Sequence, residues 1–323
     1  MVRFEAGYQK REAVRSQHHE PHKKAVSVAG PEIPLDFAAT LGRYRRYGPD
    51  GVNCFDGRTF RKVIRTPEGL RLMVLSCDED GYILLSVHPE GTPGVYKSAS
   101  TVAGKLLGLT FNLEAFYAFA ATDPVLHRAA TALPGLRPTL TADPFEMLVA
   151  LITAQQINLS FAFTTRCRLV KAYGEAMRRD DEGYYAFPTV ATLAGADPDA
   201  LRAMAFSRQK TAYMIRLAQA VNDGIIDLTG LSDQTDQTVI DHLIALTGIG
   251  RWTADWFLAR HLGRGRAAAV GDLAVRKALQ HFYFEEEKQD EATLRTFTER
   301  WGDHANLAVH YLLSLHALEG RPR

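Results

Sequence analysis

The chain has 323 residues, of which 46% are apolar and 23% are charged, and its formal net charge is +1. This length is enough for a sizeable core divided over two or three lobes. The near-zero charge excludes a global field that would attract nucleic acid, so such binding would need a local patch. No segment reaches the ~20 apolar residues of a membrane span, and the N-terminus has no signal-peptide pattern.

Three cysteines, Cys54, Cys77 and Cys167, are far apart in the sequence. Such scattered cysteines argue against a disulfide framework. We therefore expect a cytoplasmic protein that makes no membrane contact.

Residues 1–34 are predicted to form a flexible basic arm. This range is polar, with basic pairs at Lys10-Arg11 and Lys23-Lys24 and histidines at 18, 19 and 22. Both a solvated tail and an arm that touches DNA fit this pattern. Nothing nearby completes a metal shell, so the histidines receive no role.

A small antiparallel β-sheet domain is predicted over residues 35–112. Three runs rich in aliphatic and β-branched residues, Thr59–Arg65, Leu70–Cys77 and Tyr82–Val87, are separated by turn sequences. These runs indicate a meander. A separate binding module would show the same pattern.

From residue 113 to 323 the chain is predicted to be mainly helical. Apolar residues recur at helical spacing in four ranges, Leu113–Ala121, Phe145–Ile152, Leu201–Ala220 and Val239–Leu246. The fold class is therefore α+β, a mainly helical core preceded by the small sheet.

A helix-hairpin-helix is predicted at about residues 239–260. The helical run ending at Leu246 is followed by Gly248-Ile249-Gly250, and a second helix begins at Arg251. Glycines allow close approach of another molecule, and the free N–H groups that start the second helix suit a phosphate. An ordinary helix-helix turn with a glycine C-cap is the alternative.

Residues 251–277 hold six basic side chains and two acidic ones, Asp255 and Asp272. This local positive charge could contact phosphates in a salt-dependent way. A solvated helix face would have the same composition. The charge alone does not separate the two.

The segments Leu246–Ala254 and Gly271–Leu279 resemble the helix-hairpin-helix and Gly/Pro-Asp signature of the HhH-GPD base-excision DNA glycosylases. Three further segments are similar to the family: 144–157, 206–213 and 301–308. The resemblance spans roughly residues 105 to 318. It implies a core of two helical lobes that flank a cleft.

Within this superfamily the sequence is most similar to the alkylated-base branch, the bacterial 3-methyladenine DNA glycosylase II type. Bifunctional members carry a lysine nucleophile where this chain has Trp252. Because tryptophan cannot form a Schiff base, no strand-cutting lyase activity is expected. The three scattered cysteines also make an iron-sulfur cluster of the four-cysteine type unexpected.

Asp272 is the predicted catalytic residue. As a damaged base leaves, the sugar develops positive charge, which an anion beside C1′ stabilises. The same anion can orient or deprotonate the attacking water. The alternative is that Asp272 merely caps the helix that follows it. Both roles are compatible, and the surrounding signature favours catalysis.

The resemblance also implies the remaining site residues. Trp252, Trp256 and Tyr311 would line the base pocket, although packing in the core is the alternative for the tryptophans. Gln156 takes the position of the residue that fills the gap left by the flipped base, often a leucine in relatives, or it is simply a polar loop residue. Predicted DNA contacts are Gly248, Gly250, Arg251 and Thr253, and the carbonyls of Ile244, Leu246 and Ile249 would bind a monovalent cation, Na⁺ or K⁺.

The predicted function is therefore hydrolysis of the N-glycosidic bond of alkylated bases in duplex DNA, by a monomer at the nucleoid that requires no cofactor. Two alternatives stay open. A glycosylase of the same fold could act on deaminated or oxidised purines, or the hairpin could belong to a DNA-binding protein without catalysis.

Overall fold

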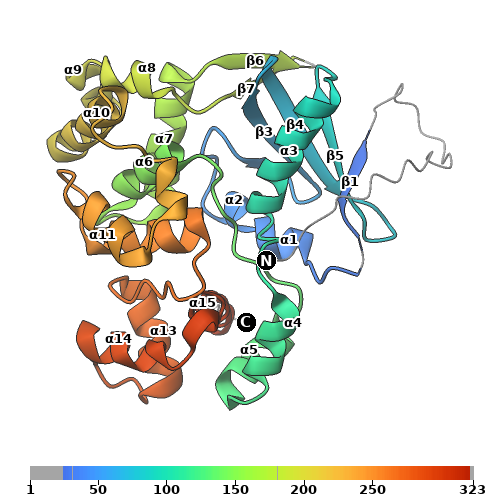
Figure 1. Ribbon diagram of the computed structural model, residues 1–323, viewed down its shortest axis with the longest axis vertical. Coiled ribbons are helices and arrows are strands. Elements are labelled where there is room, and N and C mark those ends of the chain that lie inside the picture. The colour runs from blue at the N-terminus through green and yellow to red at the C-terminus, as the bar shows by residue number, and fades with distance from the viewer. Residues whose placement is uncertain (1–24, 31, 180, 321–323) are drawn as a thin grey trace.

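The computed structural model describes residues 25–30, 32–179 and 181–320 and consists of a small β-sheet domain packed beside two helical lobes (Figure 1). The predicted α+β class is confirmed. Most of the predicted N-terminal arm, residues 1–24, lies outside the described residues. Within them, no helix is both long and apolar enough to cross a membrane.

The sheet has five antiparallel strands in the order β1-β5-β4-β3-β2. The three predicted runs form the central strands. Their bounds are β3 (Thr59–Thr66), β4 (Gly69–Cys77) and β5 (Ile83–His88), and the outer strands are β1 (Val26–Ala29) and β2 (Cys54–Phe55).

The arm assigned to residues 1–34 extends too far, because β1 lies inside it. Val26 pairs with Leu85 and Ser27 with Leu84, so β1 is an edge strand of the sheet. Four residues between polar flanks are too short for their alternation to stand out in the sequence. The strand exists because its neighbour β5 offers a free edge.

Three helices belong to the sheet domain, α1 (Phe37–Leu41), α2 (Arg43–Arg46) and α3 (Pro93–Leu106). The sequence analysis missed α3, whose buried face combines the small residues Ala99 and Ala103 with the larger Val95, Tyr96 and Leu106. That face packs with Leu85 and Val87 of the sheet in one core. The helix thus covers a sheet face that would otherwise meet water.

The helical region forms two lobes, each with its own apolar core. The first lobe holds α6 (Pro144–Ala154), α7 (Leu159–Tyr173), α8 (Val190–Ala194), α9 (Pro198–Ala203), α10 (Arg208–Asn222), α11 (Asp236–Ile244) and α12 (Arg251–Phe257). The second holds α4 (Leu113–Ala120), α5 (Pro124–Ala132), α13 (Leu273–Tyr283), α14 (Glu291–Glu299) and α15 (Ala305–Glu319). Short elements complete the chain: a hairpin of β6 (Ala176–Arg179) and β7 (Glu182–Tyr185), 3₁₀ turns η1 (Gly230–Asp233) and η3 (Gly302–His304), and a π-helical turn η2 (Leu258–Leu262).

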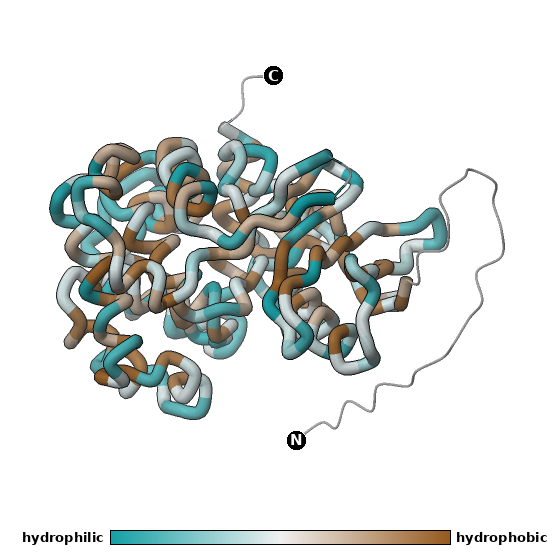
Figure 2. The backbone as a smooth tube through the Cα atoms, turned by 90° about the horizontal axis from the view of Figure 1, so that it is seen from above, coloured by the Kyte–Doolittle hydropathy of each residue, from teal (hydrophilic) through white to brown (hydrophobic). Residues whose placement is uncertain are grey.

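The second lobe contains both the beginning and the end of the helical region, and the first lobe is inserted between them (Figure 1). The connection α12–η2–α13 crosses from one lobe to the other. Hydrophilic segments gather at the outer turns of the chain (Figure 2). The predicted helical range Leu201–Ala220 is divided into α9 and α10, because Ala205 has a left-handed φ of 73° and Ser207 caps a new helix.

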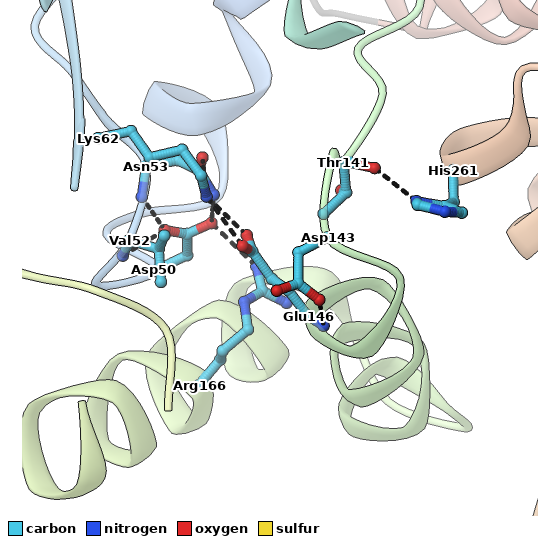
Figure 3. Close-up of polar contacts among 9 residues, drawn as sticks. All are labelled: Asp50, Val52, Asn53, Lys62, Thr141, Asp143, Glu146, Arg166 and His261. Atoms are coloured by element: carbon cyan, nitrogen blue, oxygen red, sulfur yellow. Dashed lines mark hydrogen bonds and ion pairs between the residues drawn. The ribbon is translucent and has the colours of Figure 1, made fainter. Parts of the chain in front are cut away.

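A buried charge network joins the sheet domain to the first lobe (Figure 3). Lys62 of β3 contacts Glu146 of α6 at 2.8 Å, and Arg166 of α7 contacts Asp50 at 3.3 Å. Asn53 bonds to both halves of the network. Burial raises the pKa of Glu146, whereas Arg166 and Asn53 outweigh burial and lower the pKa of Asp50. Removal of one partner from such a buried pair leaves an uncompensated buried charge, so separation of the sheet domain from the first lobe would be costly.

Candidate functional site: a glycine hairpin beside a clamped aspartate

The hairpin after α11 requires glycine at position 248. Gly248 has a φ of 90°, a left-handed conformation that other residues rarely adopt. A Cβ at this position would lie 2.2 Å from Cγ of Tyr213 on α10. The turn therefore rests directly on an aromatic ring of the first lobe.

Gly250 is different, because its surroundings are open. It precedes α12 with extended backbone angles, φ −104° and ψ −179°, and no side chain caps the helix. A Cβ here would meet nothing within 4 Å. The fold does not require glycine at this position, so the free N-terminus of α12 can be approached closely by an anion.

Asp272 immediately precedes α13 and is half-buried. Its Oδ1 accepts hydrogen bonds from the backbone N–H groups of Ala274 (2.8 Å) and Val275 (3.3 Å). Its Oδ2 accepts from the indole Nε1 of Trp252 (2.9 Å) and of Trp256 (3.3 Å). Four donors on two oxygens thus fix the carboxylate, so the capping role and the site role coexist in one residue.

The two tryptophans lie on α12, one turn apart, and both are half-buried. Trp252 packs against the core of the first lobe, and Trp256 packs against the cores of both lobes. The guanidinium of Arg260 lies 5.0 Å from the centre of the Trp256 ring. The clamped carboxylate therefore sits at the boundary between the lobes.

Tyr311 is a core residue and not part of an open pocket, which corrects its predicted role. Its side chain is 0% exposed, and its hydroxyl donates to the carbonyl of Leu136 at 2.8 Å. Its ring lies 4.9 Å from that of Phe116, and burial raises its pKa above the ordinary value. Helix α15 is buried on several faces, so its sequence does not reveal which side faces the site.

Gln156 lies at the exposed tip of the loop that connects α6 to α7. Its φ of 54° is left-handed, which turns the chain sharply at this point. The amide of the preceding residue, Gln155, donates to the carbonyl of Gly248 at 2.9 Å and to Oγ1 of Thr253 at 3.2 Å. The structure thus brings the predicted gap-filling residue beside the predicted phosphate-binding hairpin.

Thr253 was predicted to contact DNA, but its side chain is 1% exposed. Its hydroxyl accepts from Gln155 instead, so it serves the interior of the site. Arg251 is available, with 45% of its side chain exposed, and its Nε donates to Asp255 at 2.8 Å. Asp255 also accepts from Arg295 of α14 at 3.1 Å, an arrangement that the sequence analysis missed.

The local positive charge of residues 251–277 is smaller than the sequence suggests. Arg264 pairs with Asp236 at 3.2 Å, and Arg266 pairs with Asp303 at 2.8 Å. Arg260 is 7% exposed. Of the predicted basic stretch, the exposed charge nearest the hairpin is that of Arg251.

The three carbonyl groups predicted to bind a monovalent cation belong to the hairpin. The Leu246 carbonyl accepts one hydrogen bond, from the N–H of Ile249 at 3.1 Å, which leaves a second lone pair. Neutral carbonyl oxygens are ligands that a hard monovalent cation takes, so the carbonyls of Ile244, Leu246 and Ile249 are the groups that would hold one. Among the described residues, no group of three or more His, Cys, Asp or Glu side chains could hold a metal.

A helix-hairpin-helix next to an aspartate that caps the following helix, on a two-lobed helical core, is the arrangement that the family resemblance implied. Residues 149–303 match the model of the family described as HhH-GPD superfamily base excision DNA repair protein. The match covers slightly less than half of the chain and agrees with the resemblance seen in the sequence.

The relatives agree with this assignment. The chain is 25% identical to the DNA-3-methyladenine glycosylase of Bacillus subtilis (strain 168) over 89% of this chain and 95% of the relative. It is 32% identical to DNA-3-methyladenine glycosylase 2 of Escherichia coli (strain K12) over 58% of this chain and 63% of the relative. A solved structure, the 3-methyladenine DNA-glycosylase from Archaeoglobus fulgidus, superimposes with a TM-score of 0.80 at 22% identity, covering 91% of this chain and 98% of that chain.

Proposed function

We propose that the protein is a monofunctional DNA glycosylase that releases alkylated bases, of the 3-methyladenine and 7-methylguanine type, from duplex DNA. The observation that carries this proposal is the clamped carboxylate of Asp272, whose Oδ2 accepts from two indole N–H groups. Capping of α13 uses only Oδ1. The two indole donors are therefore additional to the capping role, which favours catalysis over a protein that only binds DNA.

Asp272 stabilises the positive charge that develops on the deoxyribose as the base departs. Its carboxylate needs no reorganisation during the reaction, because four N–H donors already hold it in place. An alkylated purine leaves with little assistance because it already carries positive charge. One carboxylate then suffices, and it also orients the attacking water.

The indole rings of Trp252 and Trp256 supply flat, electron-rich faces for a cationic base. Their N–H edges are directed at Asp272, so the same two residues hold the carboxylate and offer a stacking surface beside it. Electron-poor rings interact well with such faces, which favours alkylated over normal bases. Tyr311 offers no exposed surface to this pocket because its side chain is fully buried.

The strand is held by the hairpin. The open N-terminus of α12 at Gly250 and the exposed guanidinium of Arg251 bind phosphates. The carbonyls of Ile244, Leu246 and Ile249 would hold a monovalent cation, which would supply further positive charge beside the strand. Gln156 enters the stack where the base is extruded. The protein acts as a monomer in the cytoplasm, at the nucleoid, and requires no other cofactor.

Trp252 occupies the position of the lysine nucleophile of bifunctional relatives, and an indole cannot form a Schiff base. Purified protein should therefore release methylated bases from methylated DNA and leave abasic sites that break only after alkali is added. Strand breaks without alkali, or a borohydride-trapped complex, would contradict monofunctional hydrolysis. Release of hypoxanthine or 8-oxoguanine in place of methylated bases would identify a different lesion class.

A further inference from the structure

Gln155 makes a direct connection between two parts of the site that come from distant segments. It begins the loop between α6 and α7, and its side-chain Nε2 donates to the carbonyl of Gly248 (2.9 Å) and to Oγ1 of Thr253 (3.2 Å). A primary amide nitrogen has two N–H groups. Both acceptors belong to the hairpin, one before α12 and one within it.

Both acceptors are held in place independently of Gln155. The α-carbon of Gly248 lies against the ring of Tyr213, and Thr253 is 1% exposed inside the first lobe. The hairpin therefore provides a fixed surface onto which the loop is fastened. While both hydrogen bonds of Gln155 are made, the start of the loop is held in one position relative to the hairpin.

A second contact fixes the end of α6, just before this loop. Lys210 of α10 donates from Nζ to the carbonyl of Thr153, in the last turn of α6, at 2.9 Å. The same helix carries Tyr213, on which the hairpin rests. Helix α10 thus supports both the end of α6 and the hairpin, and Gln155 closes the link between them.

The residue carried by this fastened loop is Gln156, which is exposed and has a left-handed φ of 54°. The neighbouring side chains therefore point in different directions, with Gln155 bonded to the hairpin and Gln156 exposed to solvent. We propose that Gln155 is a positioning residue that couples the gap-filling Gln156 to the hairpin, so that strand binding and base extrusion act as one rigid unit. This inference depends on the proposed function.

The coupling predicts a selective defect. A rigid Gln156 lowers the cost of unpairing and unstacking the target base, which is greatest in a fully paired duplex. Loss of the amide donors should slow base release from a paired lesion by about tenfold, the effect of one or two hydrogen bonds. Release should change by less than about threefold when the lesion lies opposite an abasic site, because that base is already unpaired.

The test compares Gln155→Met, which keeps the length of the side chain but has no donor, with the wild type in single-turnover base release on both duplexes. Gln237→Met is the matched control, because Gln237 is on α11 and its amide donates only to Asp241 of the same helix at 2.8 Å. Thermal unfolding of each variant shows whether the fold is kept. An equal loss on the paired and unpaired lesions, or no loss on either, would overturn the coupling.

A second measurement does not depend on catalysis. The fluorescence of 2-aminopurine placed beside the target base reports extrusion in a complex that need not react. Gln155→Met should reduce the fluorescence increase on binding, while the affinity for undamaged duplex stays within about twofold of the wild type. If the wild type releases no base, the proposed function fails, but an unchanged fluorescence increase in Gln155→Met would separately refute the coupling.

A double-mutant cycle of Gln155→Met with Thr253→Val tests whether the hydrogen bond between these two side chains carries the effect. Thr253→Val removes one acceptor of Gln155 and leaves the carbonyl of Gly248. Once Gln155 is methionine, the loss of the Thr253 hydroxyl should add little to the defect on the paired lesion. Fully additive defects would show that the two side chains act independently and would contradict the proposal.

Discussion

Substitution by alanine should leave the stability of the fold nearly unchanged at Gly250 but reduce it clearly at Gly248. Gly250→Ala places a Cβ in open space at backbone angles that alanine adopts without strain. Loss of a glycine helix cap costs roughly 0.5–1 kcal/mol, and the lower entropy of the unfolded chain returns roughly 0.4–1 kcal/mol. The free energy of unfolding should therefore change by less than about 0.5 kcal/mol.

Gly248→Ala should destabilise the fold. The φ of 90° costs roughly 1–2 kcal/mol for a residue with a Cβ. The contact with Cγ of Tyr213, 2.2 Å from that Cβ, adds roughly 1–3 kcal/mol of overpacking. We expect a total loss of about 2–5 kcal/mol, which denaturant titration resolves easily.

The DNA affinity of Gly250→Ala tests whether the open space at Gly250 receives a phosphate of the strand. The new methyl group stands where a phosphate would approach the N-terminus of α12, so Gly250→Ala should weaken binding about tenfold or more, equally for unrelated sequences. Fluorescence anisotropy with two undamaged duplexes at two salt concentrations measures this. Affinity within about twofold of the wild type, with unchanged stability, would refute the view that the hairpin binds the strand.

Two further changes test the clamp and the lobe connection. Trp252→Phe keeps an aromatic ring but removes the donor 2.9 Å from Asp272, so single-turnover base release should fall roughly ten- to a hundredfold. Trp301→Phe is the control, because the buried Nε1 of Trp301 has no hydrogen-bond partner among the described residues. This control variant should leave the rate of base release unchanged. Burial lowers the pKa of His261 to about 4, so the folded state favours the neutral imidazole. The free energy of unfolding should therefore fall by roughly 3 kcal/mol between pH 6.5 and about pH 4, where the unfolded chain binds the proton and the folded one does not. Urea titrations across that pH range should show that the free energy of unfolding of His261→Asn depends less on pH than that of the wild type. The same pH dependence in both proteins would contradict the role given to His261.

The chemistry of the site could be predicted from the sequence because its parts lie in short, local segments. Each part of the site lies within about one turn of a helix end: the glycine turn, the tryptophans of α12 and Asp272. Near helix ends, residue type and spacing predict the local structure. The structure joins them through the bonds from Trp252 and Trp256 to Asp272. No pattern in the sequence could have shown that both indoles bond to the same oxygen.

The missed features depend on contacts between distant segments. Two adjacent glutamines look alike in the sequence, and only the left-handed turn at Gln156 separates the one that bonds to the hairpin from the one that is exposed. Tyr311 was assigned to the pocket from the family resemblance, and α15 is buried on several faces, so its sequence could not show that this side chain lies in the core. The pair of Lys62 and Glu146 joins strands and helices far apart in the chain, which no local periodicity encodes.

The central claim, that the clamped carboxylate of Asp272 drives base release, is tested most directly by Asp272→Asn. Asparagine caps a helix as well as aspartate does, so the fold should persist. A unit charge about 4 Å from the sugar cation is worth roughly 4 kcal/mol at an effective dielectric constant near 20, or about a thousandfold in rate. Single-turnover release of 3-methyladenine by Asp272→Asn should therefore fall about a thousandfold while DNA affinity is retained, and release within about tenfold of the wild type would contradict the account.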